Sequence, residues 1–597
     1  MSHISVPRRR QPHRELAVPV AACALWLFAW VAVTTATAVA GGRPSVSPVD
    51  FINPSRLVQQ YQMDGGSLVW WHLVAPTGRV NTARFWAVLV VTLSGIVGAL
   101  ALAVMCCRVC APASRRWLPL SPRGLRRGSR WATTFDLRRL RVRRPGHGSL
   151  ILGRRGTRTM ATERETSVLV VGPTRSGKTT SLVIPNLFSW RGPAIVTSTK
   201  SELVDITAAH RQGLGPVYVY DPTGEISHLY PSVSWSPMDG CQTLDRAWLV
   251  ASWLCAGLQQ GGSRSDNDWS HWAESGKLLI APLLFCAAAA ANLSIVDVRG
   301  WIHGFDLETP LSVLNEMAVA GGDDPNSDPA RAMGMLAAID QRPEKERGTV
   351  FSTVTRIFSV FNERAVAESA MTSRFNAREL CERNGTLYLC TPRQTPERVA
   401  ALFVGILMTA VTHAYAVAGN MPRGRLDPEL GLFLDELANV VPIEDLPSVA
   451  SQGAGRGVIL MSIVQDMSQL RLRYGNEKAN SVLNNHGAKL FLPGISDPET
   501  CDIVAKMIGR GDYTDVALND HNGRTNRSFT VRRDQMASPE ALRQLDEGTA
   551  VLLYRGRPPT IVGLRPWFRD RRLRALASGH FFSSAEQVSR TGPMHGR

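Results

Sequence analysis

The segment that most restricts how this 597-residue chain can fold is a short apolar run that leads straight into a glycine-rich loop. Ser167–Gly172 has the sequence SVLVVG, typical of a buried parallel strand, and the loop GPTRSGKT at 172–179 opens the apolar stretch TTSLVIPNLFSW. Further strands are predicted at Pro193–Lys200 and Pro216–Pro222, with the helical pattern SELVDITAAHRQG between them. Strands that alternate with helices predict an α/β domain built on a parallel sheet.

Apolar runs of strand length resume in the second half of the chain. They lie at Gly385–Pro392, Gly431–Ala438, Val458–Gln465 and Ala488–Gly494, and a last strand pair is predicted within TAVLLYRGRPPTIVGL. The intervening stretch, from about residue 232 to 383, has helical periodicity instead, for example at Thr243–Leu258. We therefore predict an all-α domain inserted into the α/β domain.

The loop GPTRSGKT matches the pattern G-x-x-x-x-G-K-[ST], and its position between a strand and a helix is the one that phosphate binding requires. Backbone N–H groups are expected to surround phosphate oxygens, Lys178 to reach the β- and γ-phosphates of ATP, and the Thr179 hydroxyl to bind Mg²⁺. A chance glycine-rich turn is the alternative, and the preceding strand disfavours it. The predicted nucleotide-binding residues are Gly172, Pro173, Thr174, Arg175, Ser176, Gly177, Lys178, Thr179 and Thr180.

A second acidic site is needed for hydrolysis, and the segment LFLDE is the candidate. Asp435, at the predicted strand end, is placed to hold Mg²⁺ through water, and Glu436 to orient or deprotonate the attacking water. The alternative is an ordinary exposed Asp-Glu pair at a helix start. Four preceding apolar residues and the phosphate-binding loop favour the catalytic interpretation.

Two further residues are candidates for roles in catalysis. Gln465 ends the predicted strand that follows Asp435, and it is either a sensor of the γ-phosphate or a plain polar residue at a strand end. An arginine from a neighbouring subunit is expected to stabilise the transition state in ring ATPases. Arg456 is the first candidate for this arginine, and Arg175 within the loop is its rival.

The N-terminal region contains two long uncharged stretches. Leu16–Ala40 has 25 residues and Phe85–Cys107 has 23, which exceeds the roughly 20 residues that cross a membrane as a helix. A cleaved signal peptide is the alternative for the first stretch. Arginines before the first stretch and after the second predict that both termini are cytoplasmic, in a multi-pass protein of the cell membrane, with the loop at 41–84 outside.

The formal net charge of +17 favours a polyanionic partner. Many of the arginines lie at 108–158, next to the second predicted span, where they are expected either to bind lipid headgroups or to guide nucleic acid. Most of the ten cysteines lie in apolar runs, so a disulfide framework is not expected.

The predicted organisation has nine parts along the chain. They are a cytoplasmic N-terminal tail (1–15), a transmembrane helix (16–40), a short extracytoplasmic loop (41–84), a transmembrane helix (85–107), a basic connector (108–158), the first part of the nucleotide-binding domain (159–231), the inserted all-α domain (232–383), the second part of the nucleotide-binding domain (384–568) and a disordered tail (569–597).

The ordered motifs of this chain together resemble the type IV secretion coupling proteins, the TraG-like ATPases of conjugative DNA transfer. The resemblance extends from about Val18 to Phe568. It is carried by the two apolar stretches and by GPTRSGKT, TSTKSELVDITAAHR, YDPTG, SWSPMDG, LDELANV, SIVQDMSQLRLRYG and KLFLPG.

This resemblance implies a RecA-like P-loop nucleotide-binding domain with an inserted all-α domain, a homo-hexamer around a channel, and ATP and Mg²⁺ as cofactors. It also implies ATP-driven delivery of single-stranded DNA, with a relaxase, to components of a type IV secretion channel at the membrane. Three alternatives remain. They are an FtsK-like translocase of double-stranded DNA, a protein-export ATPase, and a membrane scaffold that binds nucleotide without hydrolysing it, which Glu436 disfavours.

Overall fold

The computed structural model describes residues 86–92, 94, 129–257, 266–290, 292–322, 324–390, 396–521 and 524–579. The chain divides into two compact units, Met1–Arg126 and Arg127–Arg597. The predicted segments 1–15, 16–40 and 41–84 lie outside the described residues. Of the predicted span 85–107, residues 86–92 and 94 are described, and they are helical.

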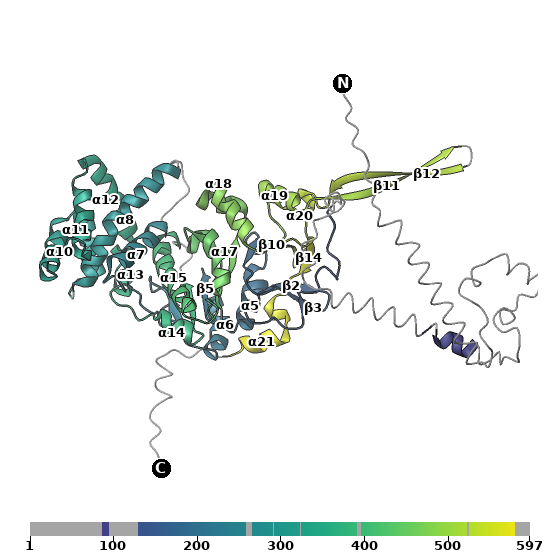
Figure 1. Ribbon diagram of the computed structural model, residues 1–597, viewed down its shortest axis with the longest axis horizontal. Helices are drawn as coiled ribbons and strands as arrows, with labels where there is room; N and C mark the ends of the chain where they lie inside the picture. The colour runs from purple at the N-terminus through teal and green to yellow at the C-terminus, as the bar shows by residue number, and fades with distance from the viewer. Residues whose placement is uncertain are drawn as a thin grey trace, which may run out of the picture. The chain divides into compact units, whose positions relative to one another are not determined.

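The second unit is built on a twelve-stranded sheet of order β1-β3-β2-β14-β13-β10-β4-β9-β8-β5-β7-β6 (Figure 1). The seven strands from β10 to β6 in this order pair in parallel. Each lies where the apolar runs predict a strand. They are β4 (Val168–Val171), β5 (Ala194–Ser198), β6 (Val217–Tyr220), β7 (Thr386–Cys390), β8 (Leu430–Leu434), β9 (Val458–Val464) and β10 (Ala488–Phe491). The predicted α/β class with a parallel sheet is confirmed.

The other edge of the sheet is antiparallel. Its strands are β1 (Arg141–Val142), β2 (Ile151–Arg155), β3 (Arg158–Ala161), β13 (Thr549–Tyr554) and β14 (Thr560–Gly563). The strands β1 and β2 lie within 108–158, which was expected to be only a connector. Leu137, Leu140, Leu150 and Leu152 are buried there, so apolar residues between the arginines place the last part of this stretch in the folded unit.

Helices cover both faces of the sheet. Leu169 and Val171 of β4 contribute to one hydrophobic core and Val168 and Val170 to another, as alternation along a strand requires. The second core is closed by the π-helical turn η3 (Thr179–Val183), α5 (Ile184–Ser189) and α6 (Glu202–Gln212). The first core is closed by α15 (Pro396–Gly419), α16 (Leu437–Val440), α17 (Leu446–Arg456), α18 (Met467–Asn485), α19 (Pro498–Ile508) and α20 (Pro539–Arg543).

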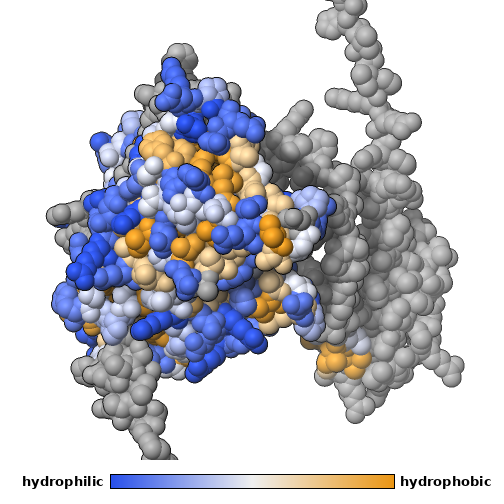
Figure 2. All heavy atoms as spheres, turned by 90° about the vertical axis from the view of Figure 1, so that its left-hand side faces the viewer, coloured by the Kyte–Doolittle hydropathy of each residue, from blue (hydrophilic) through white to orange (hydrophobic). Residues whose placement is uncertain are grey.

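The chain between β6 and β7 is helical. Its elements are α7 (Leu244–Gly257), α8 (Asp266–Ala289), α9 (Ile295–Gly304), α10 (Glu308–Ala320), α11 (Asp328–Asp340), α12 (Glu344–Phe358), η4 (Ser359–Asn362), α13 (Arg364–Ser369) and α14 (Ala377–Glu382). These helices extend away from the sheet (Figure 1). Their outer face is hydrophilic with interspersed hydrophobic patches (Figure 2).

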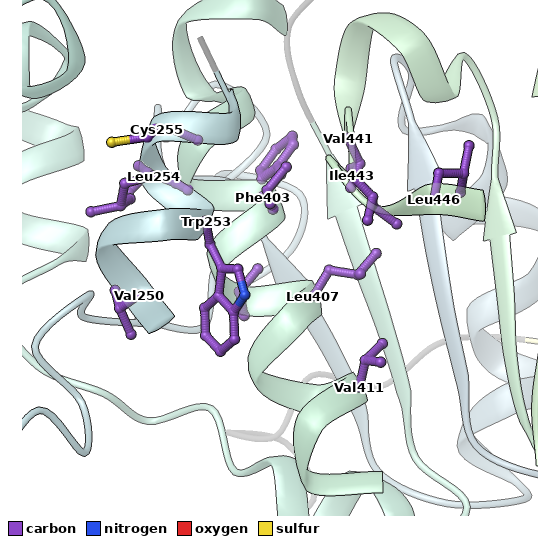
Figure 3. Close-up of a cluster of buried hydrophobic side chains, with 14 of the residues drawn as sticks. Val250, Trp253, Leu254, Cys255, Phe403, Leu407, Val411, Val441, Ile443 and Leu446 are labelled. Atoms are coloured by element: carbon purple, nitrogen blue, oxygen red, sulfur yellow. The ribbon is translucent and has the colours of Figure 1, made fainter. Parts of the chain in front are cut away.

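The helix α15 joins the helical segment to the sheet. Phe403, Leu407 and Val411 of α15 lie between Trp253 of α7 on one side and Ile443 on the other (Figure 3). Among the described residues, one stretch is long and apolar enough to cross a membrane, Arg398–Gly419 of α15, and 67% of its apolar 18-residue window is buried in the structure. Its burial and its packing identify α15 as a helix of the core.

Two features were not predicted from the sequence. The strands β11 (Arg510–His521) and β12 (Arg524–Gln535) pair in a separate antiparallel ribbon. The segment 569–597 was expected to be disordered. In the structure η5 (Trp567–Arg569) ends at its first residue, and α21 (Arg571–Ala577) lies within it. The Asp570 side chain caps α21 by accepting from the backbone N–H of Arg572, and Leu573 and Leu576 pack against the second core. That expectation was therefore wrong for α21.

Candidate nucleotide-binding site

The phosphate-binding loop begins where β4 ends and its shape depends on its glycines. A Cβ at Gly172 would lie 2.8 Å from the Cβ of Leu492, so only glycine fits beside β10. Gly177 has a φ of +84°, which favours glycine, while Arg175 adopts a φ of +65° at the exposed loop tip. The loop is thus a tight, partly strained turn that opens into η3, whose first N–H groups lack intrahelical acceptors.

Lys178 is folded back over the loop. Its Nζ donates hydrogen bonds of 2.7 Å to the carbonyl oxygens of both Gly172 and Pro173. Burial lowers the pKa of Lys178, and the nearby carboxylates of Asp435 and Glu436 oppose this shift. The ammonium group is therefore a desolvated cation held at the centre of the loop, which is where phosphate charge is expected.

Thr179 connects the loop to the predicted acidic site. Its Oγ1 donates a hydrogen bond of 2.7 Å to Oδ2 of Asp435, at the end of β8. The backbone carbonyl of Asp435 in turn accepts a hydrogen bond of 2.7 Å from Oγ1 of Thr197 in β5. The fold therefore brings together the two residues that the sequence predicts to bind Mg²⁺.

Burial governs the protonation of both carboxylates. It raises the pKa of Asp435, against the hydrogen bond from Thr179 and the charge of Lys178. Burial also raises the pKa of Glu436, and the Asp435 carboxylate raises it further. Glu436 has a φ of +52°, a left-handed conformation that is costly for a residue with a side chain. Such strain beside a perturbed carboxyl group is common at functional sites.

The sheet order explains why these residues meet. The strand β9 lies between β4 and β8, so the carboxyl ends of all three strands are at one edge. Gln465 directly follows β9, and its backbone N–H donates to Oε1 of Gln469, at 3.0 Å. The structure places Gln465 at the same edge as Lys178 and Asp435, where a role in sensing phosphate remains a prediction.

The two arginine candidates lie apart from one another. Arg456 ends α17, just before β9 begins, and so lies at the opposite edge of the sheet from the loop of its own chain. Its guanidinium group packs over the ring of Tyr415, 5.0 Å from the centroid. Within one chain Arg456 does not join the site, and its supply to a neighbouring subunit stays a prediction. Arg175 is part of the loop itself.

Two residues of the site were missed in the sequence. Thr197 anchors the Asp435 backbone, and Lys200 lowers the pKa of both Asp435 and Glu436 through its charge. Both belong to TSTK, which directly follows a predicted parallel strand. The available signal was a run of polar residues directly after a predicted strand, because the carboxyl ends of parallel strands are where ligands bind.

The donor set at this edge suits Mg²⁺ with a nucleotide. Mg²⁺ prefers oxygen ligands, keeps several waters and takes few ligands from the protein. The Thr179 hydroxyl and the Asp435 carboxylate, already in contact, match that requirement. No cluster of three or more His, Cys, Asp or Glu side chains able to hold a metal ion by themselves occurs among the residues that the structure describes.

This chain is similar to known proteins in both sequence and fold. The conjugal transfer protein TraG of Escherichia coli is 25% identical over 68% of this chain and 67% of its own length. The protein VirD4 of Rhizobium radiobacter is 23% identical over 68% of this chain and 58% of its own length. The solved structure of the bacterial conjugative coupling protein TrwBdeltaN70 has a TM-score of 0.55 at 17% identity, over 74% of this chain and 93% of that one.

A family model, described as type IV secretory system conjugative DNA transfer, matches residues 131–590. This range contains the phosphate-binding loop, the acidic strand end and the helical segment between β6 and β7. It covers more than half of the chain, and the resemblance stated from the motifs is confirmed. The chain belongs to the conjugative DNA transfer family of type IV secretion systems.

Proposed function

We propose that this chain is a membrane-anchored ATPase that couples ATP hydrolysis to the delivery of single-stranded DNA, with its relaxase, to a type IV secretion channel during conjugation. The hydrogen bond between Thr179 and Asp435 carries this proposal, because it joins a phosphate-binding loop to an acidic strand end. The site by itself supports only ATP hydrolysis. The link to DNA transfer comes from the family, which is one of conjugative DNA transfer.

The proposed cofactors are ATP and Mg²⁺. Structures of the coupling protein TrwB hold the ATP analogue ADPNP in one case and ADP with Mg²⁺ in another, and they share this fold with TM-scores of 0.54 and 0.53. In this chain Gly172–Thr180 would surround the phosphates, and Thr179 and Asp435 would hold the metal ion. Bound Mg²⁺ neutralises charge on the phosphate oxygens.

The residues of the chain would divide the remaining work. Lys178, a buried cation, places positive charge on the phosphates. Glu436, whose pKa is raised by burial and by Asp435, is suited to accept a proton from the attacking water. Gln465 at the same edge would respond to the γ-phosphate, and Arg456 of a neighbouring subunit would complete the site in a homo-hexamer.

The membrane anchor is proposed from the sequence. Two uncharged stretches, 16–40 and 85–107, are each long enough to span a membrane, and flanking arginines favour cytoplasmic termini. The helices α7–α14 interrupt the chain between β6 and β7, which supports an inserted all-α domain within 232–383 and a nucleotide-binding domain formed by 159–231 and 384–568.

The alternatives differ in their substrate. An FtsK-like translocase of double-stranded DNA is not favoured, because the matching family is one of conjugative DNA transfer and the TraG relative is a conjugal transfer protein. A protein-export ATPase differs from the proposal in having no response to DNA. The test is ATP hydrolysis by the full chain in detergent, with and without a single-stranded oligonucleotide and with a duplex of the same length.

Stimulation by the single strand is the expected result, with a smaller effect of the duplex. Turnover that neither DNA changes would favour protein export, and stimulation by the duplex alone would favour double-stranded translocation. Glu436→Gln is measured in parallel as a control for a contaminating ATPase. The rate of ATP hydrolysis by this variant must stay low with each DNA.

A further inference from the structure

A cavity lies beside η3 and α5, the helical elements that follow the phosphate-binding loop. It has a volume of about 470 Å³, and none of residues 172–180 lines it. Its walls come from the turn after β1, from β2 and β3, from η3 and α5, and from the segment that leads into α21. Of these elements, β2, β3, α5 and α21 lie close together in the second unit (Figure 1). The cavity is therefore distinct from the candidate nucleotide site.

Arginines dominate the charge of this cavity. They come from segments that are far apart in the sequence, and Asp570 is the single carboxylate in its lining. The six lining arginines are Arg143, Arg144, Arg154, Arg191, Arg565 and Arg572. The cavity thus has a large excess of positive charge. The fold assembles this charge from several segments, and no single cluster in the sequence contains it.

Asp570 neutralises only two of these arginines. It forms ion pairs of 3.1 Å with Arg154 and 3.6 Å with Arg565. Within the described part of the chain, no ion pair is formed by Arg143, Arg144, Arg191 or Arg572. Arg191 and Arg572 act on one neighbour together, because both contribute to lowering the pKa of His210, after burial and Arg211. Both positive charges therefore lie near His210, and neither belongs to an ion pair among the described residues.

The walls are held in place by buried contacts. The turn that carries Arg143 and Arg144 ends at Gly148, where a Cβ would overlap the buried carboxylate of Glu429. Glu429 is fixed by Arg164, at 2.6 Å, and Arg425, at 2.7 Å. Elsewhere in the lining, the Asp570 carboxylate both caps α21 and pairs with Arg154 of β2. The arrangement is a built pocket and does not depend on free side chains alone.

We propose that this cavity binds a compact phosphate ester, held by arginines from four separate segments. Guanidinium groups bind phosphate oxygens in bidentate geometry, which suits an uncompensated arginine cluster. The phosphate belongs either to a soluble phosphorylated molecule or to the headgroup of an anionic phospholipid, and both sources present the same chemistry. A continuous nucleic acid strand is less suited, because the arginines line one cavity of about 470 Å³, which matches a compact ligand.

The test uses the full chain in detergent, in a Lys178→Ala background that weakens phosphate binding at the loop in every sample. Titration calorimetry measures two probes separately, inorganic pyrophosphate and the soluble lipid dihexanoyl-phosphatidylglycerol, with dihexanoyl-phosphatidylcholine as the zwitterionic comparison. Arg191→Gln/Arg572→Gln removes two exposed charges of the cavity. Arg356→Gln/Arg423→Gln removes two exposed arginines elsewhere and is the matched control.

At least one anionic probe is expected to bind, and the cavity variant is expected to weaken its binding about tenfold or more, because two charged hydrogen-bond donors are lost. The matched control is expected to bind as its parent does. Pyrophosphate binding alone identifies a soluble ligand, and phosphatidylglycerol binding alone identifies a lipid.

Two results would overturn the proposal. One is the absence of binding by either probe, and the other is binding that the cavity variant leaves unchanged. A loss of single-stranded DNA binding in the cavity variant, with pyrophosphate and lipid binding unaffected, would assign these arginines to DNA instead. Ser189→Trp, which fills the cavity without removing charge, serves as a second variant if the double variant is unstable, and it must also abolish binding.

Discussion

The Thr179 hydroxyl donates a 2.7 Å hydrogen bond to the Asp435 carboxylate, across 256 residues of sequence. If this pair holds Mg²⁺, Asp435→Asn will lower ATP turnover about 100-fold or more, because the amide is a weaker metal ligand. Nucleotide affinity should then no longer differ between Mg²⁺ and EDTA. Fluorescent nucleotide titration in both conditions checks this. Thr197→Val, which loses only the hydrogen bond to the Asp435 backbone, should keep the Mg²⁺ effect.

Glu436→Gln is expected to separate binding from hydrolysis. The amide cannot accept a proton, and a general base contributes about 10²- to 10⁴-fold to the rate, so turnover should fall within that range. Nucleotide affinity should stay close to that of the wild type, because Glu436 is not among the predicted phosphate or metal ligands. Glu444→Gln changes an exposed glutamate nearby and is the control. Normal turnover in Glu436→Gln would place the base elsewhere.

Arg211 is predicted to be a residue on which stability depends. It is fully buried and donates to Thr386 Oγ1 and to the carbonyls of Trp190 and Gly192, at 2.6–2.7 Å. Arg211→Ala leaves these acceptors unpaired and should destabilise the unit by about 3 kcal/mol. Denaturant unfolding followed by tryptophan fluorescence measures the loss. The exposed Arg374→Ala should change stability by less than about 0.5 kcal/mol.

The buried His486 is predicted to make stability depend on pH. Its Nδ1 lies 2.7 Å from the Val482 carbonyl, which only accepts, so Nδ1 carries the proton and Nε2 accepts from Ser462, at 2.9 Å. Burial lowers the pKa of His486 to about 4. In the unfolded state this histidine binds a proton below about pH 6.5. The contribution of neutral His486 to the free energy of unfolding is therefore complete above that pH and is lost as the pH falls toward 4.

The magnitude follows from the two pKa values. Between pH 7.5 and pH 5 the wild type should lose about 2 kcal/mol more stability than His486→Asn, which does not titrate. Unfolding free energies of both proteins at the two pH values provide the measurement. An equal loss in the two proteins would mean that the pKa of His486 is the same in the folded and the unfolded state.

Much of the parallel sheet was predictable from the sequence for a physical reason. Strands such as Val168–Val171 and Leu430–Leu434 are covered on both faces, so they appear as uninterrupted apolar runs. The loop and the acidic pair follow such runs directly. The parallel order of β4, β9 and β8 then places Lys178, Asp435 and Gln465 at one edge.

The parts that were missed depend on tertiary contacts that leave little local pattern. Strand β1 is two residues long and is paired by β3, and α21 is stable because Leu573 and Leu576 meet the core. The ribbon of β11 and β12 did leave a signal, the Asn-Gly dipeptide between two runs of alternating character. The burial of Arg211 left no signal in the sequence, because arginine is usually exposed.

The most direct test of ATP-driven DNA transfer is Lys178→Ala, measured for conjugation frequency in cells and for ATP hydrolysis by the purified chain. Loss of the buried ammonium should lower hydrolysis at least about 100-fold and abolish transfer, while the protein stays in the membrane fraction at its normal level. Lys506→Ala, which changes an exposed lysine of α19, should have no effect. Transfer at the wild-type frequency with Lys178→Ala would contradict the proposed function.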